Sequence, residues 1–143
     1  EGKELVLIYV SHGAVIFAAD LARQIKVPMR IGSIRASSYS GRKSSGKVRL
    51  DSMPELDIKG KHVLVVDDIL DSGRTLSKIV EKLEKLRPAE IRTCVLLDKK
   101  ARRSASLEAD YSGFEIPDVF VYGYGLDYDE YFRNLPYVAC LRK

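Results

Sequence analysis

The sequence predicts an α/β fold in which a central parallel sheet is flanked by helices. Residues 5–10 form a continuous run of mostly branched apolar residues, which is typical of a strand buried on both faces of a parallel sheet, and residues 61–66 (KHVLVV) end in a second apolar run and form the clearest strand. After the second run, apolar residues recur at helical spacing over 76–86, with lysine and glutamate on the other side. A further apolar run at 91–97 completes a strand–helix–strand unit, whose crossover should be right-handed.

The other elements are expected in the following order along the chain. They are a helix at 14–25, a strand at 29–36, a mobile loop at 37–47 rich in Ser, Gly and basic residues, and strands at 119–122 and 137–141. No linker or internal repeat divides the sequence, so we expect a single domain over residues 1–143. The first strand begins close to Glu1, which suggests that an N-terminal segment is missing from this form.

Composition narrows the class of protein. The chain has 143 residues, 45% of them hydrophobic, which is enough for one core. No apolar run is long enough to cross a membrane, and no signal peptide opens the sequence. Cys94 and Cys140 lie in apolar runs without metal-ligand spacing, so we expect two free, buried thiols and a reducing cytoplasm.

The net charge of +4 is unevenly distributed. Basic residues gather at 35–49, whereas acidic residues gather in DDILD (67–71) and GLDYDEY (125–131). Separate clusters of opposite sign favour a site for a metal and a phosphate over a uniform nucleic-acid surface.

The segment after the strand at 61–66 has the features of a ligand site. Asp67 and Asp68 follow the strand directly, and ligands of open α/β sheets bind beyond the carboxyl ends of the strands. The next helix starts with Ser72, Gly73, Arg74 and Thr75. Free N–H groups at a helix start favour an anion, and capping alone would need only one such residue. Carboxylates beside an anion imply a mediating Mg²⁺ or sugar hydroxyls. No Walker A loop or dinucleotide fingerprint is present.

The segment VLVVDDILDSGRTL (63–76) resembles the phosphoribosyl pyrophosphate motif of the type I phosphoribosyltransferases. The resemblance implies that fold, with a small hood partly formed by the C-terminal segment. It implies that Asp67 and Asp68 face the ribose hydroxyls and Mg²⁺, and that Asp71 is the general base near the purine nitrogen. Ser72 to Thr75 would hold the 5′-phosphate.

The segment FEIPDVFVYGYGLDYDEYFRN (114–134) resembles the hypoxanthine-guanine phosphoribosyltransferases. By that resemblance Phe120 stacks on the purine, the main chain of Val121 reads the base edge, Asp127 holds a second Mg²⁺ beside the purine, and Arg133 contacts pyrophosphate. Lys99 matches the lysine that hydrogen-bonds the 6-oxo group, and Lys100 is its competitor. Taken alone, Phe120 would instead be a core strand residue.

Two further segments fit the family. IRASSY (34–39) resembles the start of its flexible loop, so Ser38 and Tyr39 would close over the reacting centre as a lid. A disordered surface loop is the alternative. Residues 10–13 (VSHG) fall where the family has a pyrophosphate-binding loop, commonly Leu-Lys-Gly-Gly. Ser11 replaces the lysine and His12 a glycine, before Gly13. This leaves open whether the family's non-proline cis peptide is kept, and whether His12 contacts pyrophosphate or is only tolerated.

The resemblance implies transfer of the 5-phosphoribosyl group from phosphoribosyl pyrophosphate to hypoxanthine or guanine, with Mg²⁺, in purine salvage. A homodimer or homotetramer is expected. Family members carry a longer N-terminal segment that contributes to the hood. Two alternatives stay open: a regulator of the same fold that binds RNA, and an enzyme of this fold that prefers xanthine. The sequence shows no aromatic and basic platform for RNA, so nucleic acid is not an expected partner.

Overall fold

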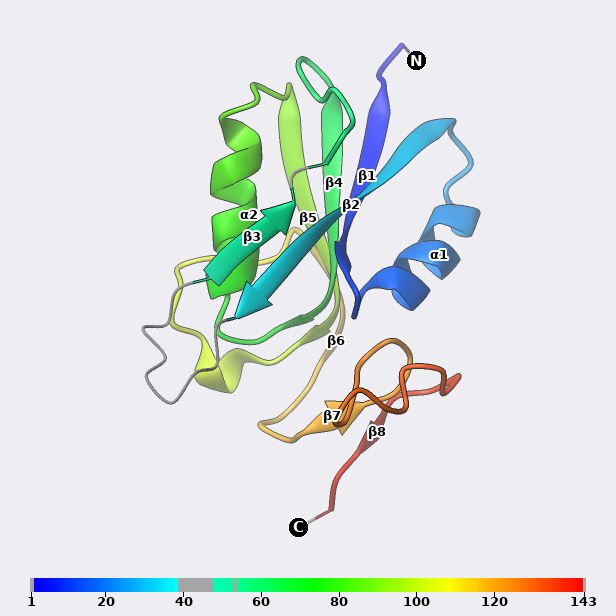
Figure 1. The fold of residues 1–143 in the computed structure, drawn as a ribbon, viewed down its shortest axis with the longest axis vertical. Helices are drawn as coiled ribbons and strands as arrows, with labels where there is room; N and C mark the ends of the chain where they lie inside the picture. The colour runs from blue at the N-terminus through cyan, green and yellow to red at the C-terminus, as the bar shows by residue number, and fades with distance from the viewer. Residues whose placement is uncertain (1, 39–47, 53, 143) are drawn as a thin grey trace.

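A six-stranded sheet forms the centre of the computed structural model, which describes residues 2–38, 48–52 and 54–142 (Figure 1). The strands are β1 (Leu5–Ser11), β2 (Met29–Ser38), β3 (Val48–Ser52), β4 (His62–Leu70), β5 (Glu90–Asp98) and β6 (Tyr111–Glu115). Their order is β3-β2-β1-β4-β5-β6. All neighbours are parallel except β2 and β3, which are antiparallel. The predicted α/β class with a mostly parallel sheet is confirmed.

Two helices cover opposite faces of this sheet (Figure 1). On one face, α2 (Arg74–Glu84) buries Ile79 and Leu83 against the sheet, whereas on the other α1 (Val15–Gln24) buries Ala18 against Leu7. Because both faces are covered, the central strands need apolar side chains on both sides, which explains their uninterrupted apolar runs. No helix in the described ranges is long and apolar enough to cross a membrane.

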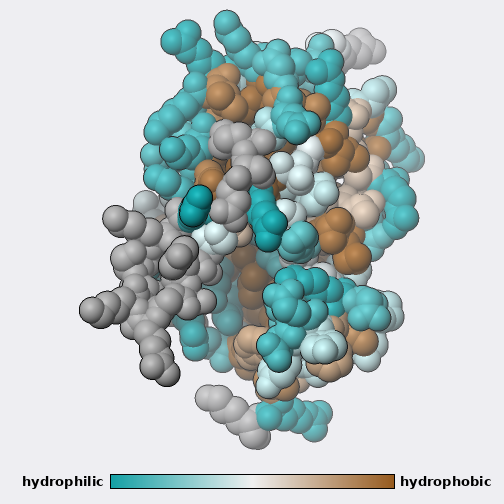
Figure 2. Space-filling view, in the orientation of Figure 1, coloured by the Kyte–Doolittle hydropathy of each residue, from teal (hydrophilic) through white to brown (hydrophobic). Residues whose placement is uncertain are grey.

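The C-terminal hood, defined here as residues 117–142, lies beyond the carboxyl ends of the parallel strands (Figure 1). It contains a two-stranded antiparallel sheet of β7 (Val121–Tyr122) and β8 (Ala139–Cys140). The surface is hollowed between the main sheet and the hood (Figure 2). The hood and the sheet therefore form the two sides of a cleft.

The hood makes close contacts with the rest of the chain. The Tyr124 hydroxyl donates to the carboxylate of Asp20 on α1. Burial and this hydrogen bond raise the pKa of Tyr124 to about 12. Gly125 has a φ of +100°, and a Cβ added there would lie 2.2 Å from the carbonyl oxygen of Gly13. Only glycine therefore allows the two main chains to approach this closely.

Several predicted boundaries were wrong. Strand β4 does not end at residue 66 but runs through Asp67 and Asp68 to Leu70, because β5 pairs with it as far as Asp98. Strands β3 and β6 were not predicted. All five residues of β6 are exposed at the sheet edge, so the segment lacks the apolar pattern of a buried strand. The predicted loop at 37–47 lies outside the described residues from 39 onward.

The prediction of two buried thiols was wrong for one of them. Both cysteines are free; Cys94 is half-buried on β5, but Cys140 is exposed on β8. Its strand belongs to the small hood sheet, which has only two short strands with which to cover side chains. The apolar run around Cys140 therefore does not indicate a core position.

Brief treatment of the native protein with iodoacetamide is expected to modify Cys140 at least about tenfold faster than Cys94, as measured by peptide mass spectrometry. Burial both covers Cys94 and raises the pKa of its thiol, which lowers the reactive thiolate fraction. In denaturant the two thiols should react at similar rates. Faster modification of Cys94 in the native protein would contradict the described burial.

Candidate active site at the carboxyl ends of the strands

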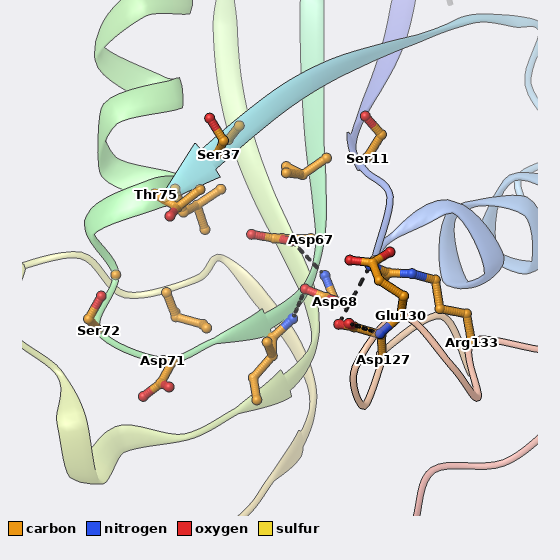
Figure 3. A pocket seen from close by; sticks show the side chains of 17 residues that line it. Ser11, Ser37, Asp67, Asp68, Asp71, Ser72, Thr75, Asp127, Glu130 and Arg133 are labelled. Atoms are coloured by element: carbon orange, nitrogen blue, oxygen red, sulfur yellow. Dashed lines mark hydrogen bonds and ion pairs between the residues drawn. The ribbon is translucent and has the colours of Figure 1, made fainter. Parts of the chain in front are cut away.

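A polar cavity of about 530 Å³ lies where β1, β2 and β4 end and α2 begins. Figure 3 shows side chains from these elements and from the hood around it. The predicted site residues in its wall are Ser11, Gly13, Asp67, Asp68, Asp71, Ser72, Gly73, Thr75, Asp127 and Arg133. Residues from distant parts of the sequence thus meet in one cavity because parallel strands place their carboxyl ends at the same sheet edge.

The start of α2 forms one end of the cavity. We call residues 71–75 the phosphate loop. Gly73 precedes the helix with a φ of +83°, a left-handed conformation that glycine adopts without strain. The first N–H groups of a helix have no carbonyl partner within it, and the helix dipole adds positive potential. Because the hydroxyl groups of Ser72 and Thr75 lie beside this helix end, it is suited to bind a phosphate.

Two adjacent carboxylates form the floor of the cavity. Asp67 is buried, and its burial together with the charge of Asp68 raises the pKa of Asp67 well above its ordinary value. The Asp68 carboxylate accepts a hydrogen bond of 2.7 Å from the N–H of Ile69. A Cβ added to Gly13 would lie 2.0 Å from Asp68 Oδ2. The acidic strand end thus lies directly against the turn after β1.

A second hollow of about 260 Å³ adjoins the first one. Its wall includes Lys99, together with Phe120, Val121 and Leu126 of the hood. The two hollows have four residues in common, namely Asp68, Ile69, Asp71 and Asp127. A ligand that filled both would therefore pass across these carboxylates.

The structure separates the two competing lysines. Lys99 is buried, and its Nζ donates to the carbonyl oxygen of Val119 at 3.1 Å. This Nζ also lies 3.8 Å from a carboxylate oxygen of Asp71 and 3.8 Å from one of Asp118. Lys100 is instead exposed and pairs with Glu115. Lys99 is thus the lysine in the second hollow.

Asp71 has one carboxylate oxygen without a hydrogen-bond partner among the described residues. This atom, Oδ1, is buried although Asp71 as a whole is partly exposed. A buried acceptor without a donor is costly.

The aromatic ring of Phe120 is half exposed and contacts Tyr128 edge to face at 5.5 Å between ring centroids. It is therefore not the core residue that the strand pattern alone would predict. On the far side of the shared wall, Arg133 donates to the carbonyl oxygen of Gly125 at 2.7 Å and lies 3.5 Å from Asp127. These contacts hold the guanidinium at the cavity edge.

The turn after β1 keeps the geometry that its sequence had put in question, since the Ser11–His12 peptide is cis. Ser11 lies in the cavity wall and its hydroxyl donates to the carbonyl oxygen of Ile34 at 3.5 Å. The His12 side chain is exposed and is not part of the described wall. Arg74 is exposed too, and its Nε donates to Ser104.

The predicted lid falls at the edge of the described chain. Ser38 is the last residue of β2, and Tyr39 lies outside the described residues. Ser37, which precedes Ser38 in β2, lines the cavity, and so does Glu130 of the hood. Neither residue was predicted from the sequence. Asp118 was also missed, and it lies between Lys99 and Arg102, whose Nε is 2.9 Å away. Ser37, Glu130 and Asp118 are polar and stand next to recognised motifs, and this was the signal in the sequence that could have identified them.

The fold and this site define a phosphoribosyltransferase domain, and the family described as phosphoribosyl transferase domain matches residues 1–129. Hypoxanthine phosphoribosyltransferase of Salmonella typhimurium is 45% identical over 139 residues, which cover 96% of this chain and 78% of that protein. Hypoxanthine-guanine phosphoribosyltransferase of Aquifex aeolicus is 47% identical over 137 residues, with coverages of 95% and 77%.

Solved structures give the same result. A hypoxanthine-guanine phosphoribosyltransferase from Bacillus anthracis superposes with a TM-score of 0.92 at 45% identity, covering 99% of this chain and 84% of that chain. A hypoxanthine phosphoribosyltransferase from Staphylococcus aureus has a TM-score of 0.93 at 41% identity, with coverages of 99% and 78%. The chain belongs to the hypoxanthine-guanine phosphoribosyltransferase family.

Proposed function

We propose that this protein is a purine-salvage transferase that moves the 5-phosphoribosyl group from phosphoribosyl pyrophosphate to hypoxanthine or guanine. The products are IMP or GMP and pyrophosphate. The observation that carries the proposal is the wall common to the two hollows, formed by Asp68, Ile69, Asp71 and Asp127. A phosphate site lies on one side of this wall and a lysine with an aromatic ring on the other, so the ribose that joins phosphate and base would lie across it.

In this proposal the donor occupies the larger cavity. The N–H groups and hydroxyls of Ser72, Gly73, Arg74 and Thr75 hold the 5′-phosphate. Arg74 contributes there through its main chain, because its side chain is directed to Ser104. Asp67 and Asp68 accept hydrogen bonds from the ribose hydroxyls. The main chain of residues 11–13 and the guanidinium of Arg133 bind the pyrophosphate.

The cavity suits Mg²⁺ held jointly by protein and substrate. In the described ranges no three acidic, His or Cys side chains are grouped as a ready-made metal site. Mg²⁺ commonly takes only one or two carboxylates and completes its shell with waters and substrate phosphates. Asp67, Asp68 and Asp127 would provide those carboxylates, and a cation there would offset the repulsion between the first two. Bound Mg²⁺ would neutralise charge on the leaving pyrophosphate.

The acceptor would occupy the smaller hollow. Phe120 would stack on the purine, the main chain of Val121 would contact the base edge, and Asp127 would close the wall beside it. Lys99 would donate to the 6-oxo group. Adenine has an amine at that position, and two facing donors would both stay unpaired, so adenine should be rejected.

The reaction requires the glycosidic nitrogen of the purine to replace pyrophosphate at the anomeric carbon. Asp71 lies on the common wall and its side chain is 41% exposed, so a purine in the second hollow could reach this carboxylate and pass its proton to it. The other contacts hold donor and acceptor in line and supply favourable charge. A homodimer or homotetramer in the cytoplasm stays a prediction that rests on the family resemblance.

Incubation with phosphoribosyl pyrophosphate and Mg²⁺ tests the proposal, with hypoxanthine, guanine, xanthine and adenine offered separately and nucleotide formation measured. We expect kcat/KM for hypoxanthine or guanine to exceed that for adenine by at least about 10⁴. The highest kcat/KM with xanthine would identify a xanthine enzyme. An absence of turnover with every base, together with tight RNA binding, would favour the regulator instead.

A further inference from the structure

Arg103 lies beneath the phosphate loop and lines neither hollow in the described chain. Its side chain is only 11% exposed and donates to the carbonyl oxygens of Leu70, Asp71 and Leu107, at 3.4, 3.0 and 3.2 Å. It also pairs with the carboxylates of Asp98 and Glu108. One guanidinium thus joins the ends of β4 and β5.

The phosphate loop depends on such contacts because it belongs to no regular element until Arg74. Strand β4 ends at Leu70 and α2 starts at Arg74, so the residues between them lie outside both elements, although the carbonyl oxygen of Gly73 accepts the first helical hydrogen bond from the N–H of Ser77. Their main chain is instead held by residues 99–105. The carbonyl oxygen of Leu70 accepts from the N–H of Lys99, and that of Ser72 accepts from the N–H groups of Ser104 and Ala105.

The stem of Arg103 also supports the loop by direct packing. A Cβ added to Gly73 would lie 3.2 Å from Cδ of Arg103 and 3.3 Å from Cβ of Ala105. The phosphate loop therefore lies directly on this arginine. Arg103 is also four residues from Lys99, so the same short segment holds the loop and provides the lysine of the second hollow.

The ion pair between Arg103 and Asp98 is buried. The side chain of Asp98 is 7% exposed, and burying both charges costs desolvation energy that their attraction repays only in part. An apolar pair would serve the core as well or better. An apolar pair could not, however, donate hydrogen bonds to the main chain of Leu70 and Asp71.

We propose that Arg103 is a positioning residue for the transfer reaction, because it sets the main chain of Asp71 and the phosphate loop relative to Lys99. This inference rests on the proposed function. The guanidinium does not touch substrate; it acts through the carbonyl groups that it holds. A lysine at this position has one cationic centre and cannot span the same acceptors.

Three variants separate positioning from stability. R103M leaves the buried Asp98 unpaired and should lower Tm by about 10 °C. The double variant D98L/R103M removes both charges and should return Tm close to the wild-type value. R92Q is the matched control, because Arg92 is half exposed and pairs with Glu90 near the far end of β5.

In the double variant we expect kcat/KM for phosphoribosyl pyrophosphate to stay about tenfold to a hundredfold below wild type despite its restored Tm. The KM of the double variant for the purine should change little. The single variant R103K should not reach the wild-type kcat/KM. R92Q should keep wild-type kinetics. Wild-type kcat and KM in D98L/R103M would overturn the proposal, because Arg103 would then serve stability alone.

Hydrogen exchange without substrate decides the inference independently of the activity. The amides of Ser104 and Ala105 should exchange at least about tenfold faster in D98L/R103M than in wild type, whereas amides within β4 and β5 should not change. If the wild-type protein turns over no purine, the proposed function fails. Hydrogen exchange is then the measurement that tests the role of Arg103. Unchanged exchange at Ser104 and Ala105 would then overturn it.

Discussion

Replacing Asp71 with asparagine is expected to lower kcat by about 10²- to 10⁴-fold, since an amide cannot take up the purine proton. Asparagine has nearly the same volume, and the phosphate loop around it keeps its main-chain contacts with Arg103 and Ser104. The affinity for phosphoribosyl pyrophosphate should therefore change little. Initial rates and calorimetric titration with phosphoribosyl pyrophosphate measure the two quantities separately.

Asp118→Asn is the matched control for this variant. Asp118 and Asp71 each place a carboxylate oxygen 3.8 Å from Nζ of Lys99, but only Asp71 lies in the wall common to both hollows. If D118N lowered kcat as much as D71N, the effect would come from the charge around Lys99 and not from proton transfer. Loss of donor binding in D71N would instead assign Asp71 to the ribose or the metal.

Gly125→Ala is expected to lower kcat/KM by about a hundredfold, because it forces the hood away from the turn at Gly13. The added Cβ would lie 2.2 Å from a main-chain oxygen, which cannot move aside as a side chain can. A non-glycine residue at a φ of +100° adds a strain of about 1–3 kcal/mol. Arg133, which donates to the carbonyl oxygen of Gly125, would shift with the hood.

Gly60→Ala separates strain from contact. Gly60 also has a positive φ, +70°, but a Cβ added there would meet no atom within 4 Å. We expect G60A to lower Tm and leave kcat/KM unchanged, and G125A to lower both. If G60A and G125A lowered Tm equally and G125A kept the wild-type kcat/KM, the contact between the hood and Gly13 would not be needed for activity.

Much of the fold was predictable from local sequence, because strands that are buried on both faces carry a recognisable run of apolar residues. The apolar runs of β1, β4 and β5 and the helical period of α2 were predictable on this ground. Strand β6 was not, since it lies exposed at the edge and is ordered by pairing with β5. The same holds for β4 beyond residue 66, where Asp67 and Asp68 stay in the strand because of their neighbour.

By itself the sequence determined the chemical class of the site, because the acidic strand end, the glycine and the hydroxyl residues of the phosphate loop are contiguous. Tertiary structure showed which of the two lysines lies in the second hollow, because Lys99 and Lys100 differ only in the direction that the end of β5 gives them. It alone brought Gly125 onto Gly13 and Arg103 beneath Asp71. These contacts join residues far apart in the chain, and no local pattern encodes a distance between them.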